Sequence, residues 1–429
     1  MTGKSKTFYL FLCPHSLLIG LFPFFIPVYL WNIGMSIGSI CFFISLTGLG
    51  FCLSLYIWDR VVRVFSFRNI ILISFFWEIL LLLTLFWGVN SETIFLLGLL
   101  NGFYNCFFWV TNRWLFSQTI TTENSGKRFG NAQLVITVFF KSGVLLGGYL
   151  LEDFGFNTVF MVSVLISVFG ILFFLFPQKR SSLPQLKSRF QAIKVSEILY
   201  YKDSYRSKLV FSLDGLFLYL ESYFWVISLF LIVQQSFWEL GLVVIALVVI
   251  FSSIYILIKN KIDRLPVHQM YIIGVVLYLL SWLMRSIMDQ NLNLPSILLL
   301  LVFISFFTSL FRLTFNKRFF DITKTESSLR YIIIKSYYSQ FCLALFFAVL
   351  GGFSYFFKDS ELFFRFTYWM AAFLSSIYLF YRPLKIKNDS KNKKLPVNKM
   401  KYFSKFNQNP TLFTNEHQRP ERLENKVVL

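Results

Sequence analysis

Twelve apolar stretches run through the sequence, and each is long enough to cross a lipid bilayer as a helix. A hydrocarbon core about 30 Å thick requires roughly 20 apolar residues in helical conformation. The chain is therefore predicted to be an all-α, multi-pass integral membrane protein. We place its spans at residues 8–31, 37–58, 69–88, 93–116, 131–151, 156–177, 210–233, 239–258, 269–288, 295–315, 334–355 and 362–382.

Lysine and arginine recur in every second connection between the spans. They precede the first span and follow each even-numbered one, whereas the connections after odd-numbered spans hold neither residue except Lys358. Cytoplasmic loops of membrane proteins carry the excess of Lys and Arg. Both termini are therefore predicted to be cytoplasmic, and we expect a bacterial inner membrane as the location.

The composition agrees with a membrane protein and explains the net charge. Hydrophobic residues make up 56% of the chain and charged residues 14%, and the formal net charge is +20. This charge belongs to the cytoplasmic loops and to a basic tail at 383–429, predicted to be disordered, so nucleic-acid binding is not expected. All five cysteines lie within spans and lack metal-ligand spacing, so we expect neither a metal nor another cofactor.

The longest internal connection, 178–209, is polar and basic and separates six spans from six. We therefore predict two six-helix bundles, 1–177 and 210–382, joined by a cytoplasmic linker. The halves also echo each other. Asp59-Arg60 follows the second span as Asp263-Arg264 follows the eighth, and Arg113 and Arg312 occupy matching places in spans four and ten.

The segment Leu55 to Arg63 resembles the loop motif G-x-x-x-D-R-x-G-R of the major facilitator superfamily. Asp59, Arg60 and Arg63 match the motif, while Leu55 and Val62 replace its glycines. Together with the twelve-span pattern, this resemblance implies two bundles related by an axis along the membrane normal, in a divergent branch of the family. It also implies alternating access and a monomer.

The resemblance further implies a cytoplasmic gate built on the two motif copies. Asp59 with Arg113, and Asp263 with Arg312, are candidate ion pairs that form in one state and break in the other. Arg60, Arg63 and Arg264 complete the candidate gate. The alternative is that these charges only anchor the topology at the membrane edge.

Several charged residues are predicted to lie inside the membrane, where a charge costs about 2.5–3.5 kcal/mol and usually faces a cavity. Lys141 and Glu221 fall near the midplane, Asp214 lies closer to the cytoplasm, and His15 lies in the inner half of its span. Glu78 is also near the middle, but the third helix is peripheral in the family. Two further charges, Lys335 and Arg285, are expected to snorkel from span ends.

Polar residues at helical spacing mark the predicted cavity-facing sides of several spans. These stripes are Gln133, Thr137 and Lys141 in span five; Asn101, Asn105 and Asn112 in span four; Asp214, Glu221, Trp225 and Ser228 in span seven; and Ser305, Ser309, Arg312 and Asn316 in span ten. The resemblance implies that helices one, four, seven and ten line the central cavity.

Each candidate has an alternative interpretation. Lys141 is a contact for a substrate anion or a partner of Glu221 or Asp214. Glu221 is a protonation site, and His15 is a proton relay or an ordinary hydrogen-bonding residue. The asparagines contact substrate or bond neighbouring helices.

These features favour a secondary active transporter of a small organic solute, coupled to protons. The chain has no G-x-x-x-x-G-K-[ST] motif for ATP and no hydrolase signature, so an enzyme is not expected. Lys141 and the asparagines favour an anionic substrate, which includes siderophores and other metabolites. The alternatives are an efflux pump for lipophilic cations and a transporter-like receptor or scaffold that no longer transports. Expected partners are the substrate, protons and membrane lipid.

Overall fold

The computed structural model describes residues 3–90, 92–118, 125–175, 192–247, 267–288, 292–325, 328–357 and 359–383. Within these ranges every regular element is a helix. The elements are α1 (Gly3–Leu21), η1 (Pro23–Phe25), α2 (Ile26–Asn32), α3 (Ile37–Val64), α4 (Phe67–Phe86), α5 (Thr93–Ser117), α6 (Ser125–Leu175), α7 (Val195–Leu199), α8 (Ser207–Tyr219), η2 (Leu220–Phe224), α9 (Trp225–Ile232), α11 (Val267–Ile287), α12 (Leu294–Thr325), α13 (Ser328–Ser354), α14 (Ser360–Ser375) and η3 (Ser376–Phe380).

Ten helical segments in the described ranges are long and apolar enough to cross a membrane, which supports the all-α membrane fold. One of them, Lys127–Leu175, covers the predicted spans five and six. Gly155 interrupts it with φ 75° and ψ 179°, a conformation that glycine adopts without steric cost. The helix Phe237–Leu247 begins the predicted span eight, whose remainder lies outside the described residues. The count of twelve spans and the side of each terminus stay predictions.

Two spans depart from regular α-helix. The first is divided near its far end, where α1 ends at Leu21, η1 begins at Pro23, and α2 begins at Ile26 with Pro27 in its first turn. The first turn of a helix accepts proline readily, because its N–H groups have no partner within the helix. The span Ser207–Ile232 contains the π-helical turn η2, which separates α8 from α9. Such single π turns are frequent at functional sites, and this one carries Glu221.

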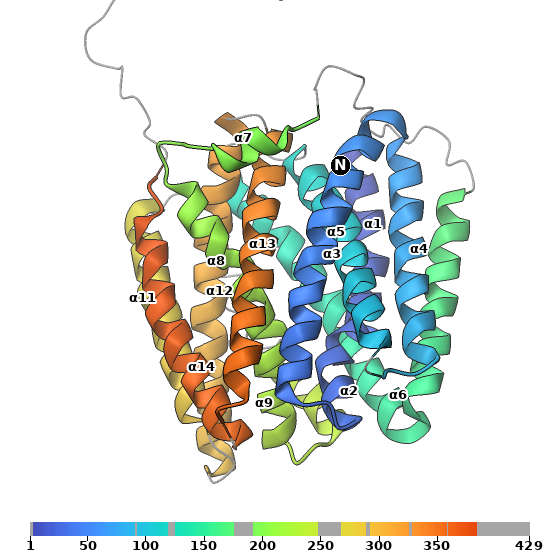
Figure 1. Cartoon of the computed structure of the whole chain (residues 1–429), viewed down its shortest axis with the longest axis vertical. Helices are drawn as coiled ribbons and strands as arrows, with labels where there is room; N and C mark the ends of the chain where they lie inside the picture. Colours follow the sequence, from blue (N-terminus) through green and yellow to red (C-terminus); the bar gives the residue numbers. More distant parts are fainter. Residues whose placement is uncertain are drawn as a thin grey trace, which may run out of the picture. The chain divides into compact units, whose positions relative to one another are not determined.

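Helices from the first part of the sequence gather on one side of Figure 1, and those from the second part gather on the other. The two groups meet where α3 packs along α13 and where α6 packs against α12. The backbones approach closely there. A Cβ atom added to Gly48 would lie 2.7 Å from the carbonyl oxygen of Gln340, and Ser45 donates a hydrogen bond to the carbonyl of Ala344 at 2.8 Å. The division into two independent bundles stays a prediction.

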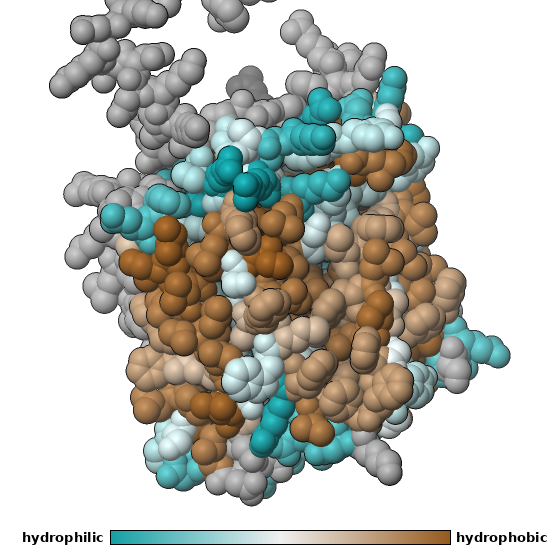
Figure 2. Space-filling model, turned by 60° about the vertical axis from the view of Figure 1, so that its left-hand side comes forward, coloured by the Kyte–Doolittle hydropathy of each residue, from teal (hydrophilic) through white to brown (hydrophobic). Residues whose placement is uncertain are grey.

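The surface supports membrane insertion. Figure 2 shows hydrophobic residues across the middle of one face and hydrophilic residues above and below them. Large apolar side chains are exposed on many helices, including Leu53 (58%), Phe169 (74%) and Phe373 (77%). Exposure on this scale is costly in water and favourable against lipid tails. The protein is therefore a multi-pass integral membrane protein.

Candidate functional site

Two adjoining cavities lie between the two groups of helices. The first has a volume of about 380 Å³ and is lined by residues of η1, α6, α8, η2, α9, α11, α12 and the helix Phe237–Leu247. The second has a volume of about 300 Å³ and is lined by residues of α1, α5, α6, α8, η2, α12 and α13. They share Gln133, Ile136, Leu218 and Glu221. We call them the first and second lobes of the central cavity.

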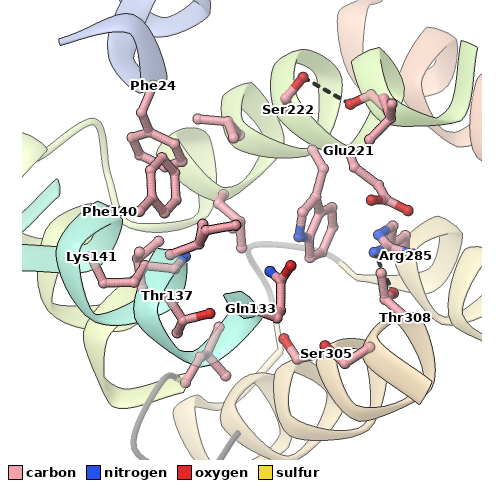
Figure 3. Close-up of a pocket in the computed structure, with 18 of the residues that line it drawn as sticks. Phe24, Gln133, Thr137, Phe140, Lys141, Glu221, Ser222, Arg285, Ser305 and Thr308 are labelled. Atoms are coloured by element: carbon pink, nitrogen blue, oxygen red, sulfur yellow. Dashed lines mark hydrogen bonds between the residues drawn. The ribbon is translucent and has the colours of Figure 1, made fainter. Parts of the chain in front are cut away.

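One polar stripe from the sequence lines the first lobe in full. Gln133, Thr137 and Lys141 follow one another at single helical turns along α6, and all three face this lobe. Figure 3 places Lys141 and Thr137 on one side of the lobe and Glu221 and Arg285 on the other, with Gln133 between them. Lys141 and Glu221 therefore border the same space without forming an ion pair.

The carboxylates of the cavity are already paired within the second group of helices. Asp214 is 2% exposed; Arg312 approaches one of its oxygens to 3.0 Å and Lys335 approaches the other to 3.0 Å. Arg312 also contacts Glu221 at 3.1 Å, and the Tyr278 hydroxyl donates to the other oxygen of Glu221 at 2.6 Å. This connected network satisfies both carboxylates, as buried charges require.

Three further cations of the cavity form no direct ion pair with a carboxylate among the described residues. Lys141 makes no hydrogen bond there; its ammonium lies 5.0 Å from the Phe140 ring centre. Arg113 lines the second lobe, also with no hydrogen bond to a described residue. Arg285 binds only neutral groups: it donates to Ser281 at 2.9 Å and Thr308 at 3.1 Å, and it stacks on a tryptophan ring. No direct ion pair therefore occupies these three cations within the described ranges.

The central cavity therefore carries a surplus of positive charge. Among the described lining residues, five are cations, whereas Asp214 and Glu221 are the only carboxylates. With all seven groups ionised, the excess is three positive charges. Cavities with low-dielectric walls focus such a field and concentrate ligands of the opposite sign.

The asparagine stripe of α5 serves mainly to join helices. The Asn101 amide donates to Thr47 of α3 at 3.1 Å and to Tyr223 of η2 at 3.2 Å, so it ties the two groups of helices together. Asn105 donates to the Asn101 side chain at 3.0 Å. Neither residue lines the two lobes, whereas Asn112 lines the second.

His15 lies away from the lining of the central cavity. Its ring is fully buried, hydrogen-bonds Ser74 of α4 at 3.2 Å and stacks on Phe108 with the ring centres 4.8 Å apart. The candidate relay thus faces α4 rather than the lobes.

Several of the candidate gate residues have partners other than the expected ones. Asp59 pairs with Arg63 at 2.5 Å and accepts a hydrogen bond from the Ile193 amide at 2.9 Å. The guanidinium of Arg60 lies over the Tyr56 ring, 3.3 Å from its centre. Arg113 and Arg312 both line the second lobe. Asp263 and Arg264 lie outside the described residues. Neither candidate gate pair is therefore seen, and the gate stays a hypothesis.

The interpretation of Lys335 and Arg285 as snorkelling residues is wrong. They are only 2% and 4% exposed, and both line the central cavity. α13 begins at Ser328, six residues before the predicted span, so Lys335 lies two turns inside the helix. Arg285 lies two turns after Tyr278 on α11, so it shares a helix face with a residue that hydrogen-bonds the cavity residue Glu221.

No group of three or more His, Cys, Asp or Glu side chains within the described ranges is arranged to hold a metal ion. The cavity thus offers ammonium, guanidinium, hydroxyl and amide groups beside aromatic rings, a set suited to binding rather than to bond cleavage.

Comparison with known proteins identifies the family. The model of the Major Facilitator Superfamily matches residues 8–258, more than half of the chain. No curated protein sequence matches. The crystal structure of the nucleoside transporter NupG has a TM-score of 0.64 and 16% identity, and the match covers 89% of this chain and 98% of that one.

A second similar structure is that of the human organic anion transporter MFSD10 (TETRAN), with a TM-score of 0.60 and 14% identity. This match covers 87% of this chain and 98% of that one. At such identities the two structures share the fold alone. The family model and the fold agree: this chain belongs to the Major Facilitator Superfamily and is a membrane transporter, not an enzyme.

Proposed function

We propose that this protein is a secondary active transporter that moves a small organic anion by alternating access and is coupled to protons. The observation that carries the substrate class is the surplus of cations in the central cavity. Lys141, Arg113 and Arg285 face it without a carboxylate partner, whereas Asp214 and Glu221 are paired. An anionic substrate would supply the missing counter-charge.

The non-polar lining supports an organic rather than an inorganic anion. Phe24, Phe140 and Trp225 contribute aromatic surface to the first lobe, and Val226, Leu229 and Val244 contribute aliphatic surface. Ligand sites for small organic molecules combine such walls with a few placed polar groups. A volume of about 380 Å³ in this lobe is at the lower end of the usual range for such sites.

Contacts at both ends of the cavity support alternating access. At the predicted external end, the Glu152 carboxylate accepts hydrogen bonds from the Phe237 amide at 3.0 Å and the Trp238 amide at 3.4 Å. At the predicted cytoplasmic end, the rings of Phe116 and Phe320 lie 4.7 Å apart. Each contact joins the first group of helices to the second, so opening the cavity to either side requires breaking one of them.

Glu221 supports proton coupling through its shared partner. Arg312 divides its two terminal nitrogens between Asp214 and Glu221. Protonation of Glu221 removes one of these attractions and leaves Arg312 with a free nitrogen for a substrate oxygen. Proton uptake and anion binding would then favour each other, which is the linkage that a symporter needs.

The other candidate functions are less well supported. NupG transports nucleosides and MFSD10 transports organic anions, as their names state; of the two, the surplus of cations fits the second. The same surplus opposes an efflux pump for lipophilic cations. Retained charges inside the cavity oppose a receptor or scaffold that does not transport. A monomeric protein in a bacterial inner membrane remains part of the proposal.

Transport into proteoliposomes tests the proposal. Purified protein is reconstituted with an imposed pH gradient, and uptake of labelled organic acids, nucleosides and lipophilic cations is measured. We expect uptake of an organic acid that collapses with the gradient and is lost in Lys141→Gln. The exposed lysine of the connection before α8 provides the matched control, Lys202→Gln, which should transport normally. Transport of a lipophilic cation by both variants would contradict the proposal, and anion binding without uptake would favour the receptor.

A further inference from the structure

A second buried carboxyl group lies outside the central cavity. Glu78 on α4 is 1% exposed, and both of its carboxyl oxygens are buried without a hydrogen bond to any described residue. α4 packs against α5 and α6, and no described residue of α4 lines either lobe. The functional interpretation of the central cavity therefore leaves Glu78 unexplained.

Polar groups surround Glu78, but none is a cation paired with it. Tyr104 of α5 and Ser167 of α6 place their hydroxyls beside the carboxyl without forming a hydrogen bond of good geometry. The Ser163 hydroxyl, one turn before Ser167, is also buried without a partner among the described residues. On α4 itself, Ser74 lies one turn before Glu78 and hydrogen-bonds His15 of α1. Hydroxyl groups of α5 and α6 thus lie beside Glu78, and the Ser74–His15 hydrogen bond joins α4 to α1 one turn away.

An ionised carboxylate in this position would be unstable. A buried charge without a counter-charge costs so much free energy that the group becomes neutral instead. Glu221 shows the opposite case, because Arg312 and Tyr278 both stabilise its ionised form. A neutral carboxylic acid would also suit the neighbours of Glu78, since its O–H donates to one hydroxyl while its carbonyl accepts from another.

We propose that Glu78 binds a proton and holds it as a neutral carboxylic acid, which makes this cluster a second proton-binding site outside the central cavity. Helix α1 connects the two sites. Phe8 of α1 and Phe24 of η1, which follows α1 in the same span, line the central cavity, while His15 of α1 faces α4. A movement of α1 during transport would change the surroundings of Glu78, so proton release there would be linked to the conformation of the protein.

Infrared spectroscopy of the purified full-length protein tests the proposal directly. A protonated carboxylic acid gives a carbonyl band that ionised carboxylates lack and that shifts in D₂O. We expect this band at neutral pH in the wild type and its loss in Glu78→Gln. The matched control is Glu221→Gln, which should retain the band. If Glu78→Gln does not fold, Glu78→Asp provides the test instead. In that variant the carbonyl band of the protonated acid should shift in frequency rather than vanish.

Thermal unfolding as a function of pH provides an independent measurement. Unfolding would release the proton of Glu78 to water, so the stability of the wild type should fall as pH rises above the range where an exposed glutamate ionises. Glu78→Gln should match the wild type at acidic pH and exceed it at alkaline pH. Parallel pH profiles would overturn the proposal. Stabilisation by Na⁺ that disappears in Glu78→Gln would also overturn it, because the site would then bind a metal cation as a carboxylate. Neither measurement depends on transport activity.

Discussion

The charges that line the central cavity or lie deep in the membrane are mostly paired in the second group of helices and unpaired in the first, with Arg285 of the second group as an exception. In the second group, Asp214, Glu221, Arg312 and Lys335 form one connected network in which each carboxylate has a cation. In the first group, Lys141 and Glu78 are charged residue types without an ionic partner in the described residues. The paired charges hold one another in fixed positions, whereas we infer that each unpaired residue binds a ligand. We infer an anion for Lys141 and a proton for Glu78.

The largest expected effect comes from breaking the network. Asp214→Ala removes the shared partner of Arg312 and Lys335 and leaves two cations buried. Loss of one member of a buried ion pair costs about 3–5 kcal/mol. Thermal unfolding in detergent should show a large decrease in Tm. The exposed Asp153 supplies the control variant Asp153→Asn, and equal Tm values for both variants would show that the network does not stabilise the fold.

Neutralising an unpaired cation should affect ligand binding rather than stability. Lys141→Gln leaves no carboxylate without a partner, so the protein should fold with an unchanged Tm. Affinity for an anionic substrate should fall tenfold or more, because a hydrogen bond to a charged group contributes about 1.5–3 kcal/mol. Titration of the purified protein with the anion measures this. Lys335→Gln is the contrasting variant, and a similar loss of stability in both would remove the distinction between the two groups.

Glu221 is both a member of the ion-pair network and the proposed binding site for the coupling proton. Glu221→Gln keeps a possible acceptor for Tyr278 but removes the charge that attracts Arg312, which retains Asp214. The expected loss of stability is about 1–3 kcal/mol. Anion binding should become independent of pH, since the proposed coupling proton has no site. Pronounced pH dependence in this variant would assign the coupling to another residue.

The smallest expected effect concerns the neutral bonds between the groups. Asn101→Ala removes the hydrogen bonds from α5 to Thr47 and Tyr223. Hydrogen bonds between membrane helices contribute on average about 0.6 kcal/mol each. We expect a small decrease in Tm with normal transport. Loss of transport at unchanged Tm would instead give Asn101 the substrate role that its stripe first indicated.

The sequence predicted the membrane fold well because the bilayer constrains it strongly. A span must be apolar over roughly 20 residues and must satisfy its own backbone hydrogen bonds. The described helices therefore coincide with eleven of the predicted spans and with the first part of span eight. The stripe Gln133, Thr137 and Lys141 was equally accessible, because helical periodicity places these residues on one face whatever surrounds them.

The pairing of charges was not accessible from the sequence. The depth of a residue in the membrane can be counted along its helix. The rotation of each helix about its own axis, which decides which side chains meet, cannot be read from the sequence. Glu221 and Lys141 lie at similar depth, yet Glu221 pairs with Arg312 instead. The sequence placed Lys335 near the start of a span predicted to begin at residue 334. The helix α13 in fact begins at Ser328, because its first turn contains polar residues that a hydropathy criterion leaves out. The π-helical turn at Glu221 was not predicted from the sequence either.

One measurement tests the central claim most directly: the thermal stability of the purified protein against a panel of organic anions, nucleosides and lipophilic cations. A ligand that binds only the folded state at a hundredfold excess over its Kd adds about 2.7 kcal/mol of stability. The unpaired cations of the central cavity predict that an organic anion raises the Tm of the wild type and not that of Lys141→Gln. Stabilisation by a lipophilic cation alone, equal in both proteins, would contradict the account.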